Sequence, residues 1–122
     1  MPTEGEIRWL KSQPLAVQLA AVEKVWQERA DYMVLVADQL WAVGKYEKAL
    51  GEVVAFAESA AKSYEGLVRP TDFSRFGKER LRDIAGNAIC RTAIVREVVI
   101  DGGDGLDTET LVRVCERLGF VL

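Results

Sequence analysis

The stretch Gly44-Lys-Tyr-Glu-Lys-Ala-Leu-Gly-Glu-Val-Val-Ala-Phe-Ala-Glu-Ser-Ala-Ala-Lys62 decides the fold class of this chain. Gly44 suits the left-handed conformation that ends a helix. Apolar residues then recur at spacings of three and four, which is the period of one helix face. They are Tyr46, Ala49, Leu50, Val53, Ala57, Ala60 and Tyr64. A glycine turn followed by such a stripe predicts the second arm of a helical hairpin.

The first arm is predicted as one long helix, because no helix breaker occurs between Pro14 and Gly44. Its core-facing stripe is predicted to contain Val22, Val25, Trp26, Ala30, Met33, Ala37, Leu40 and Trp41. A helix of about 30 residues is roughly 45 Å long, which exceeds what a small bundle needs to cover its core. We therefore expect a homodimer that uses the apolar end of this helix. The residues expected there are Trp9, Leu10, Leu15 and Leu19.

Two further helices are predicted after Gly66, where the second arm should end. The third should begin at Thr71 or Asp72 and continue to about Ile100, although Val98 to Ile100 also suits a strand. Its apolar face is Leu81, Ile84, Ala85, Ala88, Thr92, Val95 and Val98. Asp107 should cap a last helix that runs to Gly119. The sequence thus predicts one all-α domain over residues 1–122, an up-and-down bundle of four helices, or five if Glu4 to Lys11 is helical.

Composition narrows the class of protein. The chain has 122 residues, of which 49% are apolar and 29% charged, and these values predict a soluble, cytoplasmic protein with no membrane partner. It has no histidine, which excludes catalytic triads and zinc sites that depend on that side chain. We expect no catalytic residue, no bound metal and no cofactor, and an enzyme is the less favoured reading. Cys90 and Cys115 are both expected to be buried thiols.

Positive charge is concentrated in the predicted third helix. Residues 69–96 contain seven bases and three acids, a net charge of +4, whereas the remainder has sixteen acids and nine bases, a net charge of −7. At helical spacing these bases could follow a line of phosphates, which would make binding to RNA or a nucleotide sensitive to salt. The candidate binding residues are Arg75, Lys78, Arg82, Arg91 and Arg96. The alternative is a solvated face whose charges pair locally.

The hairpin resembles the central hairpin of the HEPN superfamily, small helical domains associated with RNA and nucleotides. The matching residues are Gly44, Tyr46, Ala49, Glu58, Ala60 and Lys62, with Ala37, Leu40 and Trp41 before the glycine. Ribonucleases of that superfamily carry Arg-Asn-x-x-Val-His-x-Tyr late in the bundle. Here the corresponding segment reads Arg91-Thr-Ala-Ile-Val95-Arg96-Glu97-Val98, so arginine stands in the place of histidine.

A guanidinium stays protonated and cannot act as a general base. The resemblance therefore implies a non-catalytic HEPN-like protein, with Arg91 in the position of the active arginine and Arg96 free to bind phosphate. Its partner would be RNA, a nucleotide or a protein such as a nucleotidyltransferase-like protein, in a pairing of the toxin–antitoxin type.

Two alternatives stay open. The first is a purely structural protein–protein interaction subunit of a larger assembly. The second is an all-α nucleotide pyrophosphohydrolase resembling the MazG family, with a carboxylate-bound metal. The acids available for it are Glu52, Glu58, Glu79 and Asp83, but they lack the Glu-x-x-Glu and Glu-x-x-Asp spacing of those enzymes.

Overall fold

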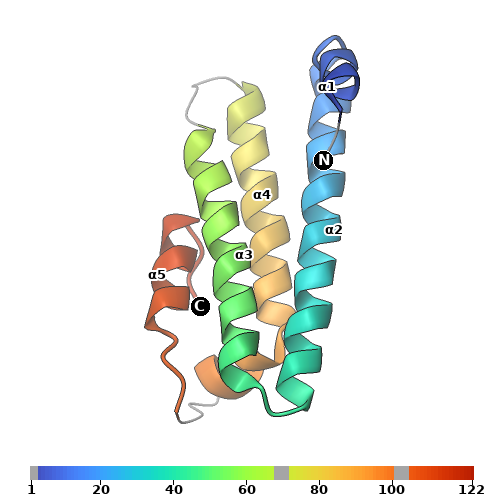
Figure 1. The fold of residues 1–122 in the computed structure, drawn as a ribbon. Helices are drawn as coiled ribbons and strands as arrows, with labels where there is room; N and C mark the ends of the chain where they lie inside the picture. The colour runs from blue at the N-terminus through green and yellow to red at the C-terminus, as the bar shows by residue number, and fades with distance from the viewer. Residues whose placement is uncertain (1–2, 68–71, 101–104) are drawn as a thin grey trace.

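The chain folds into an all-α bundle, as the sequence predicts (Figure 1). The computed structural model describes residues 3–67, 72–100 and 105–122, and the side chains of residues 7, 10, 11, 15 and 72–76 are also outside the description. The helices are α1 (Glu4–Lys11), α2 (Leu15–Ala42), α3 (Tyr46–Gly66), α4 (Asp72–Arg91), the π-helix η1 (Val95–Ile100) and α5 (Glu109–Arg117). The described residues contain no strand, so the strand considered at Val98 to Ile100 is wrong.

Three long helices, α2, α3 and α4, pack pairwise, with α3 antiparallel to both α2 and α4 and with α2 and α4 parallel to each other. The short α5 packs on the outside of α3, and α1 lies against the N-terminal end of α2 (Figure 1). As a result, α2 forms one edge of the bundle, with a whole side that no other described helix covers. No helix in the described ranges combines the length and apolarity needed to cross a membrane.

The turn at Gly44 has the geometry that the sequence predicts. Gly44 has a φ of 78°, and its N–H donates to the carbonyl of Trp41 at 3.0 Å. The N–H of Lys45 donates to the carbonyl of Leu40 at 2.9 Å, which completes the two-bond pattern of a Schellman motif. These bonds satisfy carbonyls that would otherwise end α2 without a partner, and they fix the direction in which α3 begins.

The core is built around small side chains on α3. Its buried positions are Ala49, Leu50, Val53, Phe56, Ala57, Ala60 and Ala61. Four of the seven are alanines, so the backbones of neighbouring helices can approach α3 closely. Larger side chains from α2, among them Trp26, and from α4 fill the space around this face. The rings of Trp26 and Phe56 meet edge to face, with centroids 6.0 Å apart.

Several positions predicted for the core lie at the surface instead. Val22 and Val25 are exposed, and Tyr46 is 49% exposed at the start of α3. Val25 falls on the side of α2 away from Ala30 and Ala37, whereas Val22 lies one turn before the buried Trp26 on the core-facing stripe and is still 43% exposed. Cys115 is buried but Cys90 is exposed, so the predicted pair of buried thiols is wrong.

The third predicted helix is interrupted. It ends at Arg91 instead of running to Ile100, and the chain bends at Thr92 before η1. The buried Thr92 hydroxyl donates to the carbonyl of Ile89 at 2.7 Å, and the N–H of Ala93 donates to a carboxylate oxygen of Asp38 at 2.9 Å. A side chain of α2 thus replaces the helical acceptor at the bend.

At the start of α5, the Asp107 carboxylate accepts the N–H of Glu109 at 3.1 Å as predicted, but the residue at the N-cap position is Thr108. The helix ends at Arg117, two residues before the predicted end at Gly119. The cap predicted at Thr71 or on the Asp72 side chain lies outside the described residues.

Candidate functional site

The predicted basic residues do not gather on one face. Lys78 lies with its Nζ 4.9 Å from the centroid of the Tyr64 ring, on the side of α4 that meets α3. Arg82 follows one turn later, and its Nε lies 3.6 Å from a carboxylate oxygen of Asp83. Arg91 points to α2 instead, and its Nη2 lies 3.1 Å from a carboxylate oxygen of Asp31. Lys78 and Arg82 are therefore neighbours, whereas Arg91 belongs to a different side of the helix.

The remaining two candidates lie apart from these. Arg96 comes after the bend, is exposed, and forms no ion pair with another residue that the structure describes. The side chain of Arg75 lies outside the described residues. The nearby Arg80 forms an ion pair with α2, because its Nε lies 3.3 Å from a carboxylate oxygen of Glu23.

The groove beside Arg91 is acidic. It has a volume of about 600 Å³ and lies between α2 and the end of α4. Its lining residues are Asp31, Val34, Leu35, Asp38, Gln39, Ala42 and Arg91. The hydrogen bond from Arg91 lowers the pKa of the Asp31 carboxyl, so this aspartate stays ionised. Two carboxylates against one guanidinium leave a groove with no excess positive charge for a phosphate.

The carboxylates considered for a metal site are separated as well. Glu58 accepts a hydrogen bond from Arg117 of α5 at 2.8 Å, whereas Asp83 lines a groove between α4 and α2. Glu52 and Glu79 are both exposed. Within the described ranges no three potential metal ligands of the carboxylate, thiol or imidazole type lie together.

Glu58 has a structural role instead. Arg117 also binds both carboxylate oxygens of Glu65, at 2.8 and 3.0 Å, and so ties α5 to α3 across two turns. This contact lowers the pKa of Glu65.

The first prominent surface is the uncovered side of α2. Val25 is 53% exposed and Tyr32 is 68% exposed, and both lie opposite the core side of the helix. Val17, Val22, Leu35 and Val43 are further exposed apolar residues of the same helix or its C-terminal cap. The sequence predicts the exposed apolar surface nearer the N-terminus. Trp9 is exposed there, Leu19 is half-buried, and the side chains of Leu10 and Leu15 lie outside the described residues.

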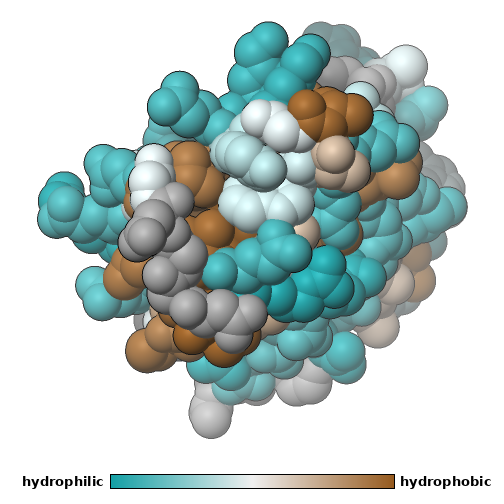
Figure 2. All heavy atoms as spheres, turned by 90° about the horizontal axis from the view of Figure 1, so that it is seen from below, coloured by the Kyte–Doolittle hydropathy of each residue, from teal (hydrophilic) through white to brown (hydrophobic). Residues whose placement is uncertain are grey.

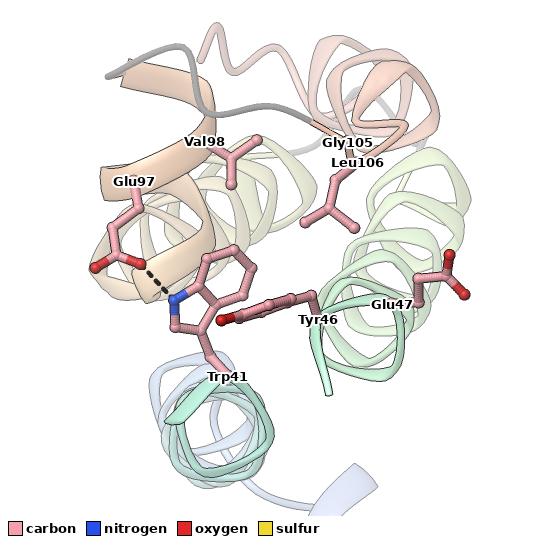
Figure 3. Close-up of a pocket in the computed structure, with 7 residues that line it drawn as sticks. All are labelled: Trp41, Tyr46, Glu47, Glu97, Val98, Gly105 and Leu106. Atoms are coloured by element: carbon pink, nitrogen blue, oxygen red, sulfur yellow. Dashed lines mark hydrogen bonds between the residues drawn. The ribbon is translucent and has the colours of Figure 1, made fainter. Parts of the chain in front are cut away.

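The second surface is a pocket at the end of the bundle where α2 turns into α3. Figure 2 views the molecule from this end, where apolar residues reach the surface between hydrophilic ones. The pocket has a volume of about 490 Å³. It is lined by Trp41, Tyr46, Glu47, Glu97, Val98, Gly105 and Leu106 (Figure 3). The Trp41 and Tyr46 rings lie with centroids 4.5 Å apart, and the Trp41 indole N–H donates to a carboxylate oxygen of Glu97.

Sequence reasoning missed this pocket, because its residues come from four separate segments. The available signal was the pair of aromatic residues on either side of Gly44. Helical periodicity predicts both rings in the core, whereas the turn at Gly44 places them at the edge of the core.

Comparisons with known proteins give no relative. No protein-family model, no curated protein and no solved structure matches the chain. Inferences about function therefore rest on the molecule itself.

Proposed function

We propose that this protein is an interaction module, and that the uncovered side of α2 is the surface through which it binds a second copy of itself. The supporting observation is that α2 is apolar on both sides while the bundle covers one. Exposed apolar side chains such as Val25 and Tyr32 on the uncovered side suit a partner surface, although this side also carries Glu28 and Arg29. The outer stripe is Gln18, Ala21, Val25, Tyr32, Val36 and Gln39.

The order of residues in the outer stripe suits a second copy in particular. The positions are symmetric about the midpoint between Glu28 and Arg29. In an antiparallel pair related by a twofold axis, Val25 would face the partner's Tyr32 and Ala21 the partner's Val36. At the axis, Glu28 would lie near the partner's Arg29, and two opposite-charge pairs would form if each Arg29 guanidinium turned outward from its contacts with Trp26 and with Ser59 of α3. Large side chains then meet smaller ones, and negative charge meets positive.

The size of this surface indicates how strong the dimer is. A 28-residue helix is about 42 Å long, and a contact strip about 10 Å wide gives an area on the order of 400 Å² per copy. That is below the roughly 800 Å² per partner of a standard interface. The dimer should therefore form in the micromolar range, and the monomer should remain folded.

Sedimentation velocity over a range of protein concentrations tests this proposal. The wild type should shift from monomer to dimer, and the double variant Val25→Glu/Tyr32→Glu should stay monomeric with an unchanged circular-dichroism spectrum. Val121→Glu is the matched control, because Val121 is 83% exposed and lies outside the outer stripe. A wild-type protein that stays monomeric at high micromolar concentration, or a dimer that survives the double substitution, would refute the proposal.

Association with RNA or a nucleotide is the second candidate function, in keeping with the HEPN-like hairpin. It is favoured by the adjacency of Lys78 and Arg82 and by the exposed Arg96. Labelled RNA should then be retained at low salt and released at high salt. Lys78→Glu/Arg82→Glu should abolish retention without changing the oligomeric state. Retention that is unaffected by this pair of substitutions would eliminate this candidate.

We also propose that the protein is located in the cytoplasm. The exposed thiol of Cys90 is unpaired, as is usual in a reducing compartment.

A further inference from the structure

The pocket beside Trp41 lies apart from the outer stripe of α2. Trp41 is half-buried against η1, whereas Val25 and Tyr32 lie on the opposite side of the same helix. Dimer formation through the outer stripe would leave this pocket open. Its chemistry can therefore be considered independently of the proposed dimer.

Two aromatic rings form one wall of the pocket. The planes of Trp41 and Tyr46 meet at 59°, and the rings face across the pocket toward Val98 and Leu106 (Figure 3). Tyr46 is 49% exposed and Val98 is buried, so the cavity runs from the solvent to the core. An aromatic face combined with aliphatic side chains suits a group that has an apolar surface of its own.

Two glutamates line the pocket: Glu97 lies beside the Trp41 indole, and Glu47 lies next to Tyr46 on α3 with its carboxylate directed away from the rings (Figure 3). Within the ranges that the structure describes, no basic side chain lies within ion-pair distance of either. Glu97 accepts the Trp41 indole N–H, and an ionised carboxylate has further lone pairs available. Elsewhere Asp31, Glu58 and Glu65 each have an arginine partner. The negative charge at the pocket is not compensated in this way.

The backbone that carries Glu97 supports a binding role. Glu97 and Val98 belong to η1, a π-helix of six residues. π-helical turns are rare and occur frequently at functional sites. Here two of the six residues of the π-helix line the pocket. The segment is anchored to α2 by the hydrogen bond from Ala93 to Asp38.

We propose that this pocket binds an organic cation, an N-methylated ammonium group in particular. Aromatic faces attract such cations through their negative quadrupole, and flanking carboxylates add Coulomb attraction. The volume of about 490 Å³ lies within the range of small-ligand pockets. Methyl groups on nitrogen would contact Val98 and Leu106, which a strongly hydrated bare ammonium would not favour. The same group occurs on free molecules such as choline and on methylated lysine side chains of proteins.

Nuclear magnetic resonance of the indole N–H signals tests the proposal directly. The chain has three tryptophans, so Trp9 and Trp26 act as internal controls for Trp41. Choline should shift the Trp41 signal, with saturation below about 10 mM, while the other two signals stay in place. Its neutral carbon isostere, 3,3-dimethylbutan-1-ol, has the same shape and should bind about tenfold more weakly. Equal binding of the two probes, or no Trp41 shift with either, would overturn the proposal.

Charge variants and peptides complete the experiment. Glu97→Gln and Glu47→Gln should each weaken choline binding several-fold, whereas Glu52→Gln, an exposed acid elsewhere on α3, should leave it unchanged. A loss of binding that is equal in all three variants would contradict recognition by the two pocket carboxylates. A glycine-flanked peptide with trimethyllysine, compared with free choline, then identifies the source. Tighter binding of the peptide points to a protein partner, and tighter binding of choline points to a free small molecule.

Discussion

Replacing Asp38 by alanine is the most informative single change in the bundle, because one side chain supports the bend between α4 and η1. The Asp38 carboxylate accepts the N–H of Ala93 at 2.9 Å, and Ala93 is only 8% exposed. The variant leaves this N–H without an acceptor at the start of a helical segment. Loss of an N-terminal cap costs about 0.5–2 kcal/mol, and a buried unsatisfied donor costs about 1–3 kcal/mol. Since water can enter through the adjoining groove, we expect a loss of about 1.5 kcal/mol in the free energy of unfolding.

Urea unfolding followed by circular dichroism measures this loss. Asp38→Asn keeps an acceptor oxygen and should retain most of the stability. Asp31→Ala is the matched control, because Asp31 lines the same groove but makes an exposed ion pair with Arg91 and should matter less. The Trp41 indole signal should also move in Asp38→Ala, since its acceptor Glu97 lies on η1. A loss in Asp38→Ala no larger than in Asp31→Ala would refute the reasoning.

Three further outcomes are expected. Gly44→Ala should lower the free energy of unfolding by about 1–2 kcal/mol in urea titrations, because a side chain is strained at a φ of 78°. The hydrogen bond from Arg117 lowers the pKa of Glu65 in the folded protein. The stabilisation that this ion pair gives the fold is therefore complete above the pKa that Glu65 has in the unfolded chain, and it is lost as the pH falls through the lower pKa of the folded state. Arg117→Ala should therefore flatten the dependence of the melting temperature on pH between about pH 5 and pH 3, and a profile parallel to the wild type would contradict this. Burial raises the pKa of Cys115 to about 12, so mass spectrometry should find one alkylated thiol, Cys90, in the native protein and two after unfolding.

The parts of the fold that depend on local signals could be predicted from the sequence. Gly44 and Gly66 lie at the ends of helices as expected. Glycine has no side chain and favours the end of a helix through its own backbone, so this signal does not depend on the rest of the fold. The interruption after Arg91 could not be predicted in this way. The segment contains no proline or glycine, and the bend depends on Asp38, a residue 55 positions earlier in the chain.

The candidate site was less predictable than the fold. Helical period alone does not say how far along or around α2 the other helices cover it, so it predicts Val22 and Val25 in the core although both are exposed. Arg91 could be identified as a basic residue, but its acidic surroundings come from α2. The pocket beside Trp41 needs α2, α3 and η1 in their final positions before the Glu97 carboxylate comes near the rings.

The alanine face of α3 determines where this sequence can change over evolutionary time. Ala49, Ala57, Ala60 and Ala61 have no exposed surface, and adding even one or two carbons at such positions typically costs about 1–3 kcal/mol. The buried Ala30 and Ala37 of α2 and Ala85 and Ala88 of α4 carry the same limit, whereas the solvent-facing sides of these helices do not. Descendants of one ancestor could therefore differ at most surface positions and still keep the spacing of small residues on α3. Distant relatives of this chain are best sought by that spacing rather than by overall identity.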